Sequence, residues 1–177
     1  MPVSDTPTLS AAQIQRVWEG MLGAETRANY FADLVYRLNR GQKVLTWSTL
    51  FLSSGALISI LAELPADYRW LRVALVGLST ALSLYSTVRQ NQKVAVDAAK
   101  LHSRWLKIAN AYTDIWENVY ASEARDKLDA VTAMETEASE ASNGLPYRKG
   151  LMLKWEKHVV NQHGAQLPGA GITTATF

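Results

Sequence analysis

The chain has 177 residues, a formal net charge of +2 and no cysteine. This length supports one domain or a small membrane module. The lack of cysteine excludes a disulfide framework and thiol chemistry, and the small net charge gives no reason to expect an acidic partner, so no nucleic acid is expected.

Residues 10–43 are predicted to form an N-terminal cytoplasmic helix. Ser10 is a suitable N-cap, because its hydroxyl can accept a bond from a free backbone N–H of the first turn. Apolar or small residues then recur at alternating spacings of three and four, which is typical of helices that pack knobs-into-holes. They are Ile14, Val17, Met21, Ala24, Ala28, Phe31, Val35 and Leu38.

Residues 44–88 are predicted to form a two-helix transmembrane hairpin. Residues 44–62 and 73–88 carry no charged side chain, and about 20 apolar helical residues cross a membrane. Trp47 and Tyr85 would lie at one interface, with Tyr68 and Trp70 at the other. The alternative is a helical bundle that buries both segments, but a domain this small can hardly cover two such helices on every side.

Lysine and arginine are concentrated outside the predicted turn, which indicates that both termini are cytoplasmic. Hydroxyl side chains share one face of each predicted span. They either line a wet pore or satisfy each other and the backbone at helix contacts. The candidate pore-lining residues are Thr46, Thr49, Ser53, Thr80, Ser83 and Thr87.

Residues 89–142 are predicted to form one long cytoplasmic helix with the same alternating pattern. We call its apolar stripe the assembly seam, and it can pair with the first helix of the same chain or with neighbouring subunits. Its residues are Val94, Leu101, Trp105, Ile108, Tyr112 and Ile115. From Ser122 the pattern is lost and acidic residues accumulate, which indicates a solvated helix end or an acidic docking face.

Residues 143–177 are predicted to form a short basic amphipathic helix and a flexible tail. Asn143, Gly144 and Pro146 give a strong signal for the end of the preceding helix. The helix expected at residues 147–163 either lies on the inner leaflet of the membrane or folds back on the two arms, the predicted cytoplasmic helices of residues 10–43 and 89–142.

No catalytic constellation, cofactor motif or metal site is apparent, so we expect no enzyme, no cofactor and no bound metal. His158 and His163 are five residues apart, which does not place them on one helical face. His102 adjoins the assembly seam and is expected to flank it. The fold class predicted is therefore an all-α membrane protein with a transmembrane hairpin, two coiled-coil-like arms and a short C-terminal helix.

This layout resembles the SLATT family of two-transmembrane effector domains. The likeness rests on an amphipathic helix with Tyr30, Tyr36, Arg37 and Arg40, a tight hairpin, and Leu-His-Ser-Arg-Trp at residues 101–105 of a long helix. It implies an oligomeric effector of the bacterial inner membrane that forms a pore or disrupts the membrane in antiphage defence. The implied partners are the lipid bilayer, further copies of the chain, and a separate sensor or nucleotide-signal-producing protein. The alternative is a non-conducting anchor or scaffold that recruits a soluble partner through its helices and its tail.

Overall fold

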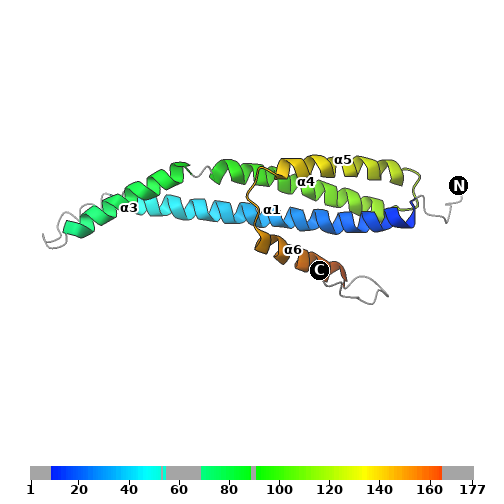
Figure 1. The fold of residues 1–177 in the computed structure, drawn as a ribbon, viewed down its shortest axis with the longest axis horizontal. Coiled ribbons are helices and arrows are strands. Elements are labelled where there is room, and N and C mark those ends of the chain that lie inside the picture. The colour runs from blue at the N-terminus through cyan, green and yellow to red at the C-terminus, as the bar shows by residue number, and fades with distance from the viewer. Residues whose placement is uncertain (1–8, 53, 55–68, 89–90, 165–177) are drawn as a thin grey trace. The chain divides into compact units, whose positions relative to one another are not determined.

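A computed structural model describes residues 9–52, 54, 69–88 and 91–164. Within these ranges every regular element is a helix and no strand occurs (Figure 1). The helices are α1 (Ala11–Leu52), α3 (Arg69–Val88), α4 (Asn91–Glu117), α5 (Ala124–Ser142) and α6 (Lys149–Gly164). The chain divides into two compact units, one of residues 1–33 and 98–177 and one of residues 34–97.

The start of α1 follows from a reciprocal capping box. The backbone N–H of Gln13 donates to the Ser10 hydroxyl over 3.3 Å, and the Gln13 side-chain oxygen accepts from the Ser10 backbone N–H over 2.9 Å. Two backbone donors that the helix leaves free are thereby satisfied. The prediction of Ser10 as the N-cap is confirmed, and Gln13 is its unpredicted partner.

The core of the first unit is formed by the apolar stripes of α1 and α4. Along α1 the side chains of Val17, Met21, Ala24 and Ala28 are buried. On α4 the buried residues include Leu101, Trp105, Ile108, Tyr112 and Ile115. Each large apolar side chain contributes roughly 1.5–3 kcal/mol on burial. The alternating spacing therefore identified the buried face of both helices.

The structure divides the predicted long helix of residues 89–142. The chain turns at residues 118–123, and α5 runs back along α4 (Figure 1). Two ion pairs connect the antiparallel helices, Lys127 with Asp114 at 2.6 Å and Arg104 with Glu137 at 3.1 Å. The buried residues of α5 are Ala124, Leu128, Val131 and Ala138. Their spacing continues the alternating pattern, with Glu135 in the position where an apolar residue is expected.

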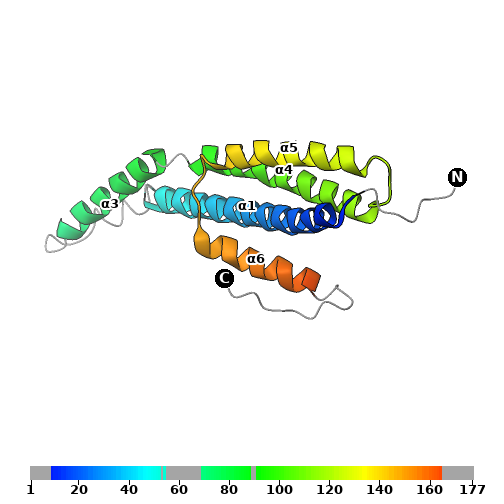
Figure 2. The same ribbon diagram turned by 45° about the vertical axis from the view of Figure 1, so that its right-hand side comes forward.

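Helix α6 folds back along the first half of α1 (Figure 2). The Asp33 carboxylate accepts hydrogen bonds from the Lys154 ammonium and from the Trp155 indole N–H, each over 3.2 Å. At the other end of α6, His163 Nε2 lies 2.7 Å from Glu25 Oε2. Of the two positions expected for this helix, the structure has the one against the N-terminal arm.

The predicted transmembrane hairpin is wrong. No helix in the described ranges is both long enough and apolar enough to cross a membrane. In α3 the aliphatic residues are interrupted by hydroxyl side chains such as Ser79 and Thr80, and its first turn contains Arg69 and Arg72. The predictions that depended on this hairpin are therefore wrong as well. They are the membrane fold class, the pore and the location in the inner membrane. Much of the first predicted span, residues 53 and 55–62, lies outside the described residues.

In the second unit, α3 and the end of α1 leave large apolar side chains exposed. On α1 these are Val44, Trp47, Leu50 and Phe51. On α3 they are Trp70, Val73, Val76, Leu78, Leu84 and Tyr85. Contiguous exposed apolar patches mark sites where a protein contacts other proteins, membranes or ligands.

Gly20 of α1 is required by the packing of Tyr112. A Cβ atom at residue 20 would lie 2.5 Å from the Tyr112 ring, whereas a Cβ at Gly23 would meet nothing closer than the Arg27 guanidinium at 3.6 Å. The Tyr112 side chain is only 1% exposed, so its ring has little room to move.

We therefore expect Gly20→Ala to lower the free energy of unfolding by about 1–3 kcal/mol, the usual cost of overpacking. The matched control, Gly23→Ala, should be neutral or stabilising, because alanine is favoured over glycine within a helix by up to about 1 kcal/mol. Urea unfolding followed by circular dichroism measures both. Equal stabilities of the two variants would contradict the close contact.

Candidate functional site

A carboxylate at the centre of the first unit connects three helices. Glu135 of α5 accepts a hydrogen bond from Arg27 of α1 over 3.1 Å and another from the Tyr112 hydroxyl of α4 over 2.8 Å. The Arg27 and Glu135 side chains are 39% and 28% exposed, so the pair is only partly screened by water. Two charge-assisted bonds explain why a glutamate occupies a position of the apolar pattern.

The environment of Tyr112 strongly favours its neutral form. Burial, followed by the hydrogen bond and the negative charge of Glu135, raises the pKa of Tyr112 from 10.0 to about 12. The phenol is thus held as a hydrogen-bond donor to a carboxylate. This hydrogen bond connects α4 to α5.

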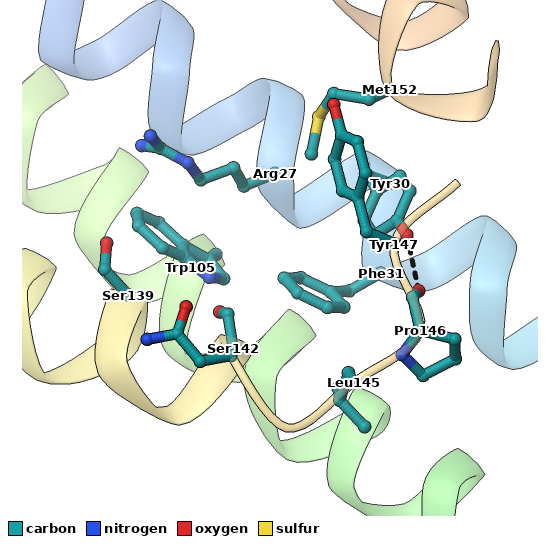
Figure 3. Close-up of a pocket in the computed structure, with 11 residues that line it drawn as sticks. Arg27, Tyr30, Phe31, Trp105, Ser139, Ser142, Leu145, Pro146, Tyr147 and Met152 are labelled. Atoms are coloured by element: carbon teal, nitrogen blue, oxygen red, sulfur yellow. Dashed lines mark hydrogen bonds between the residues drawn. The ribbon is translucent and has the colours of Figure 1, made fainter. Parts of the chain in front are cut away.

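Arg27 of this cluster also lines a cavity of about 220 Å³ (Figure 3). Its lining residues come from α1, α4, the end of α5, the connection to α6, and α6 itself; they include Arg27, Phe31, Trp105, Ser139 and Tyr147. The Arg27 guanidinium lies over the Trp105 ring, 4.6 Å from its centre. Aromatic side chains and one cation therefore face the same space.

Tyr30 lines the cavity and bonds to the α5–α6 connection. Its hydroxyl donates to the Pro146 carbonyl and accepts from the Arg148 backbone N–H, each over 3.0 Å. Tyr30 also lies edge-on to Phe31, with ring centroids 5.1 Å apart. These bonds fix the α5–α6 connection against α1.

Trp105 has an unpartnered donor. Its side chain is 1% exposed, and its Nε1 is the only buried side-chain polar atom in the described part of the chain that has no hydrogen-bond partner. Leaving a buried donor unpaired costs about 1–3 kcal/mol. In Figure 3 the nitrogen side of the indole is directed toward Phe31 and Ser142. This donor was not anticipated from the sequence, although a tryptophan on an apolar stripe always has an N–H that needs a partner.

The assembly seam is located inside a single chain. Leu101, Ile108 and Ile115 are buried in the core of the first unit with Trp105 and Tyr112. Val94 is half-buried and belongs to the second unit. The buried seam residues hold one chain together and are not available to a neighbouring subunit.

The candidate pore-lining hydroxyls that are described bond to their own helices. Thr46 donates to the Gln42 carbonyl, Thr49 to that of Leu45 and Thr80 to that of Val76, at 2.9–3.0 Å. This is the alternative expected from the sequence, in which hydroxyls satisfy the backbone. The side chains of Ser53, Ser83 and Thr87 lie outside the described parts of the structure.

The three histidines have structural partners. His102 Nδ1 lies 2.9 Å from the Ala28 carbonyl, which only accepts, so Nδ1 carries the proton and joins α4 to α1. His158 packs edge-on against Trp155 and His163 against Trp18. Among the described residues no group of three or more histidine, aspartate or glutamate side chains is arranged to hold a metal ion.

Comparisons with protein-family models, with curated proteins and with solved structures found no match. The geometry therefore defines the class of protein by itself: an all-α protein whose first unit is a bundle of α1, α4, α5 and α6. The resemblance to the SLATT family, the role in antiphage defence and the separate sensor stay predictions.

The raised pKa of Tyr112 predicts a specific pH dependence of stability. In the unfolded chain the phenol ionises near its ordinary value of 10.0, whereas in the folded chain it stays protonated to about 12. Its stabilising contribution is therefore complete below pH 10 and is lost as the pH rises through 12. The loss amounts to roughly 2–3 kcal/mol.

Urea unfolding of the wild type and Tyr112→Phe at about pH 9 and pH 12 measures this contribution. The phenylalanine variant should lose less stability between the two pH values, because it has no phenol to ionise. Glu135→Gln should show an intermediate loss, because burial still disfavours the phenolate there. The same loss in the wild type and in Tyr112→Phe would contradict the assignment.

Proposed function

We propose that the chain is a non-catalytic helical module that assembles with further copies of itself through α3. The observation that carries this proposal is the exposure of the apolar residues of α3. Their burial against another chain contributes roughly 1.5–3 kcal/mol for each large side chain, which is enough for a few of them to hold an assembly.

The exposed residues of α3 include one stripe with the spacing of a packed helix. Trp70, Val73, Gly77, Thr80 and Leu84 are all exposed and follow one another at alternating intervals of three and four. We call this set the α3 stripe. Such an arrangement is typical of helices that pack knobs-into-holes. At Gly77 an added Cβ would meet nothing within 4 Å, so a second backbone can approach closely there.

A second copy of the chain is the occupant that the charges favour. No charged residue occurs between Val73 and Val88, so two identical stripes can face each other without repulsion. Symmetric pairing of one patch with itself is the commonest form of assembly among soluble oligomers. Residues 73–88 offer a partner of different composition no charged group with which to form an ion pair.

The polar groups of the first unit support a structural role over a catalytic one. Arg27, Glu135 and Tyr112 are bonded to each other, and His163 is bonded to Glu25. Each of these groups has a partner within the chain that accounts for its position.

Cysteine cross-linking tests the proposal directly, because the chain has no cysteine of its own. Gly77→Cys should give a disulfide-linked dimer on mild oxidation, since symmetric stripes bring the two thiols within bonding range. The matched control is Gly150→Cys on α6, where an added side chain also meets nothing within 4 Å. This variant should stay largely uncross-linked.

Light scattering on the full chain provides the second measurement. The wild type should have the mass of two or more chains, and Val73→Glu combined with Gly77→Glu should reduce that mass, because buried unpaired charge is costly. A monomeric wild type, or equal cross-linking at residues 77 and 150, would refute assembly through the α3 stripe.

A further inference from the structure

The sizes of the side chains in the α3 stripe follow nearly the same order in both chain directions. Gly77 lies at the middle of the stripe, with Val73 four residues before it and Thr80 three residues after it. The two large residues, Trp70 and Leu84, each lie seven residues from Gly77 and are 67% and 62% exposed. The stripe therefore has a centre without a side chain, two medium-sized residues beside it and a large residue at each end.

Two copies of the stripe approach most closely at Gly77. A Cβ added at this residue would meet nothing within 4 Å in its own chain, and a glycine permits the backbone of a second helix to come near. Crossing helices diverge on both sides of their closest point, so contact is kept only if the side chains become larger toward the ends. The twofold axis of a symmetric pair is therefore expected at Gly77.

Parallel and antiparallel pairs place different side chains opposite each other. In a parallel pair every residue faces its own copy, so two tryptophans meet at one end and two leucines at the other. In an antiparallel pair Trp70 of one copy faces Leu84 of the other at both ends. The distance between packed helices depends on the side chains at the contact. Only the antiparallel pair is therefore spaced equally at its two ends, and it keeps the whole stripe in contact.

The charges of α3 favour the same orientation. Arg69 and Arg72 are in its first turn, and the helix has no other charged residue. The N-terminal end of a helix is already the positive end of its dipole. A parallel pair brings two such ends together, whereas an antiparallel pair places each beside the negative end of the other helix. Arg89 directly follows α3 in the sequence, so antiparallel pairing gives three arginines at each end and parallel pairing gives four at one end.

We propose that two copies of the chain pair through the α3 stripe in antiparallel orientation, about a twofold axis at Gly77. Trp70 of each copy packs against Leu84 of the other, and Val73 lies beside Thr80. This inference rests on the assembly proposed above and adds which residues of the two copies meet.

Single-cysteine variants of the full chain measure the orientation, because the chain has no cysteine of its own. In the antiparallel pair the two copies of residue 73 are about 12 Å apart along the helix axis, and those of residue 80 about 9 Å. A disulfide allows at most about 7 Å between Cα atoms, so Val73→Cys and Thr80→Cys should each cross-link poorly alone. An equimolar mixture, with a size tag on one variant, should give at least about fivefold more mixed disulfide than either homodimer.

Gly77→Cys is the matched control, because residue 77 faces its own copy in either orientation and should cross-link in both. Suppose that this variant cross-links, that Val73→Cys also cross-links with itself, and that the mixture gives no excess of mixed disulfide. The pairing is then parallel, and the orientation is wrong although the assembly stands. If Gly77→Cys does not cross-link and the wild type is monomeric, the assembly is absent and the orientation falls with it.

Complementary charges provide an independent measurement. Trp70→Lys and Leu84→Glu each place a charge against an apolar residue, and each should weaken the assembly measured by light scattering. The double variant has two lysine–glutamate pairs in an antiparallel assembly but like charges opposite each other in a parallel one. Its dissociation constant should therefore be about fivefold lower than that of either single variant.

Circular dichroism shows that each variant is folded, which is expected because the changed residues are exposed. A double variant that assembles no more tightly than the single variants would overturn the antiparallel orientation.

Discussion

The contact between the Tyr112 ring and the backbone of α1 at Gly20 is the constraint on which the first unit depends. Because residue 20 has no side chain, the ring can lie against the helix, with its hydroxyl directed to Glu135. Glu135 is then in place to bond Arg27. The lack of a side chain at Gly20 thus allows the contacts that position α1, α4 and α5 relative to one another within this unit.

The same arrangement explains the cavity. Arg27 reaches from α1 toward Glu135 and covers the Trp105 ring on its way. On the other side, the bonds of Tyr30 to Pro146 and Arg148 fix the α5–α6 connection against α1. The space between these two fixed points is lined by aromatic rings and is not filled by the chain.

Much of the helical pattern could be predicted from the sequence, and particular residues show why the rest could not. Ser10 caps α1, and Asn143 and Gly144 follow the end of α5, because capping and chain reversal depend on adjacent residues. The reversal at residues 118–123 was missed because Glu135 interrupts the apolar stripe of α5 and made this segment look solvated. The transmembrane hairpin was wrong because a lack of charge was taken for apolarity, although hydroxyl side chains interrupt the aliphatic residues of α3 and Arg72 stands in its first turn.

The sequence by itself determined the helical character of the described segments, where α1, α4 and α6 begin and α5 ends to within about two residues, and which face of α1 and α4 is buried. These properties arise from interactions between residues within a few positions of each other. Only the tertiary structure decided that the seam is covered by the same chain, that α6 lies against α1, and that Arg27, Trp105 and Tyr147 share a cavity. Those outcomes depend on partners far apart in the chain, such as Arg27 and Glu135, which are 108 residues apart. No local pattern specifies such pairs, because they form only after the helices have packed.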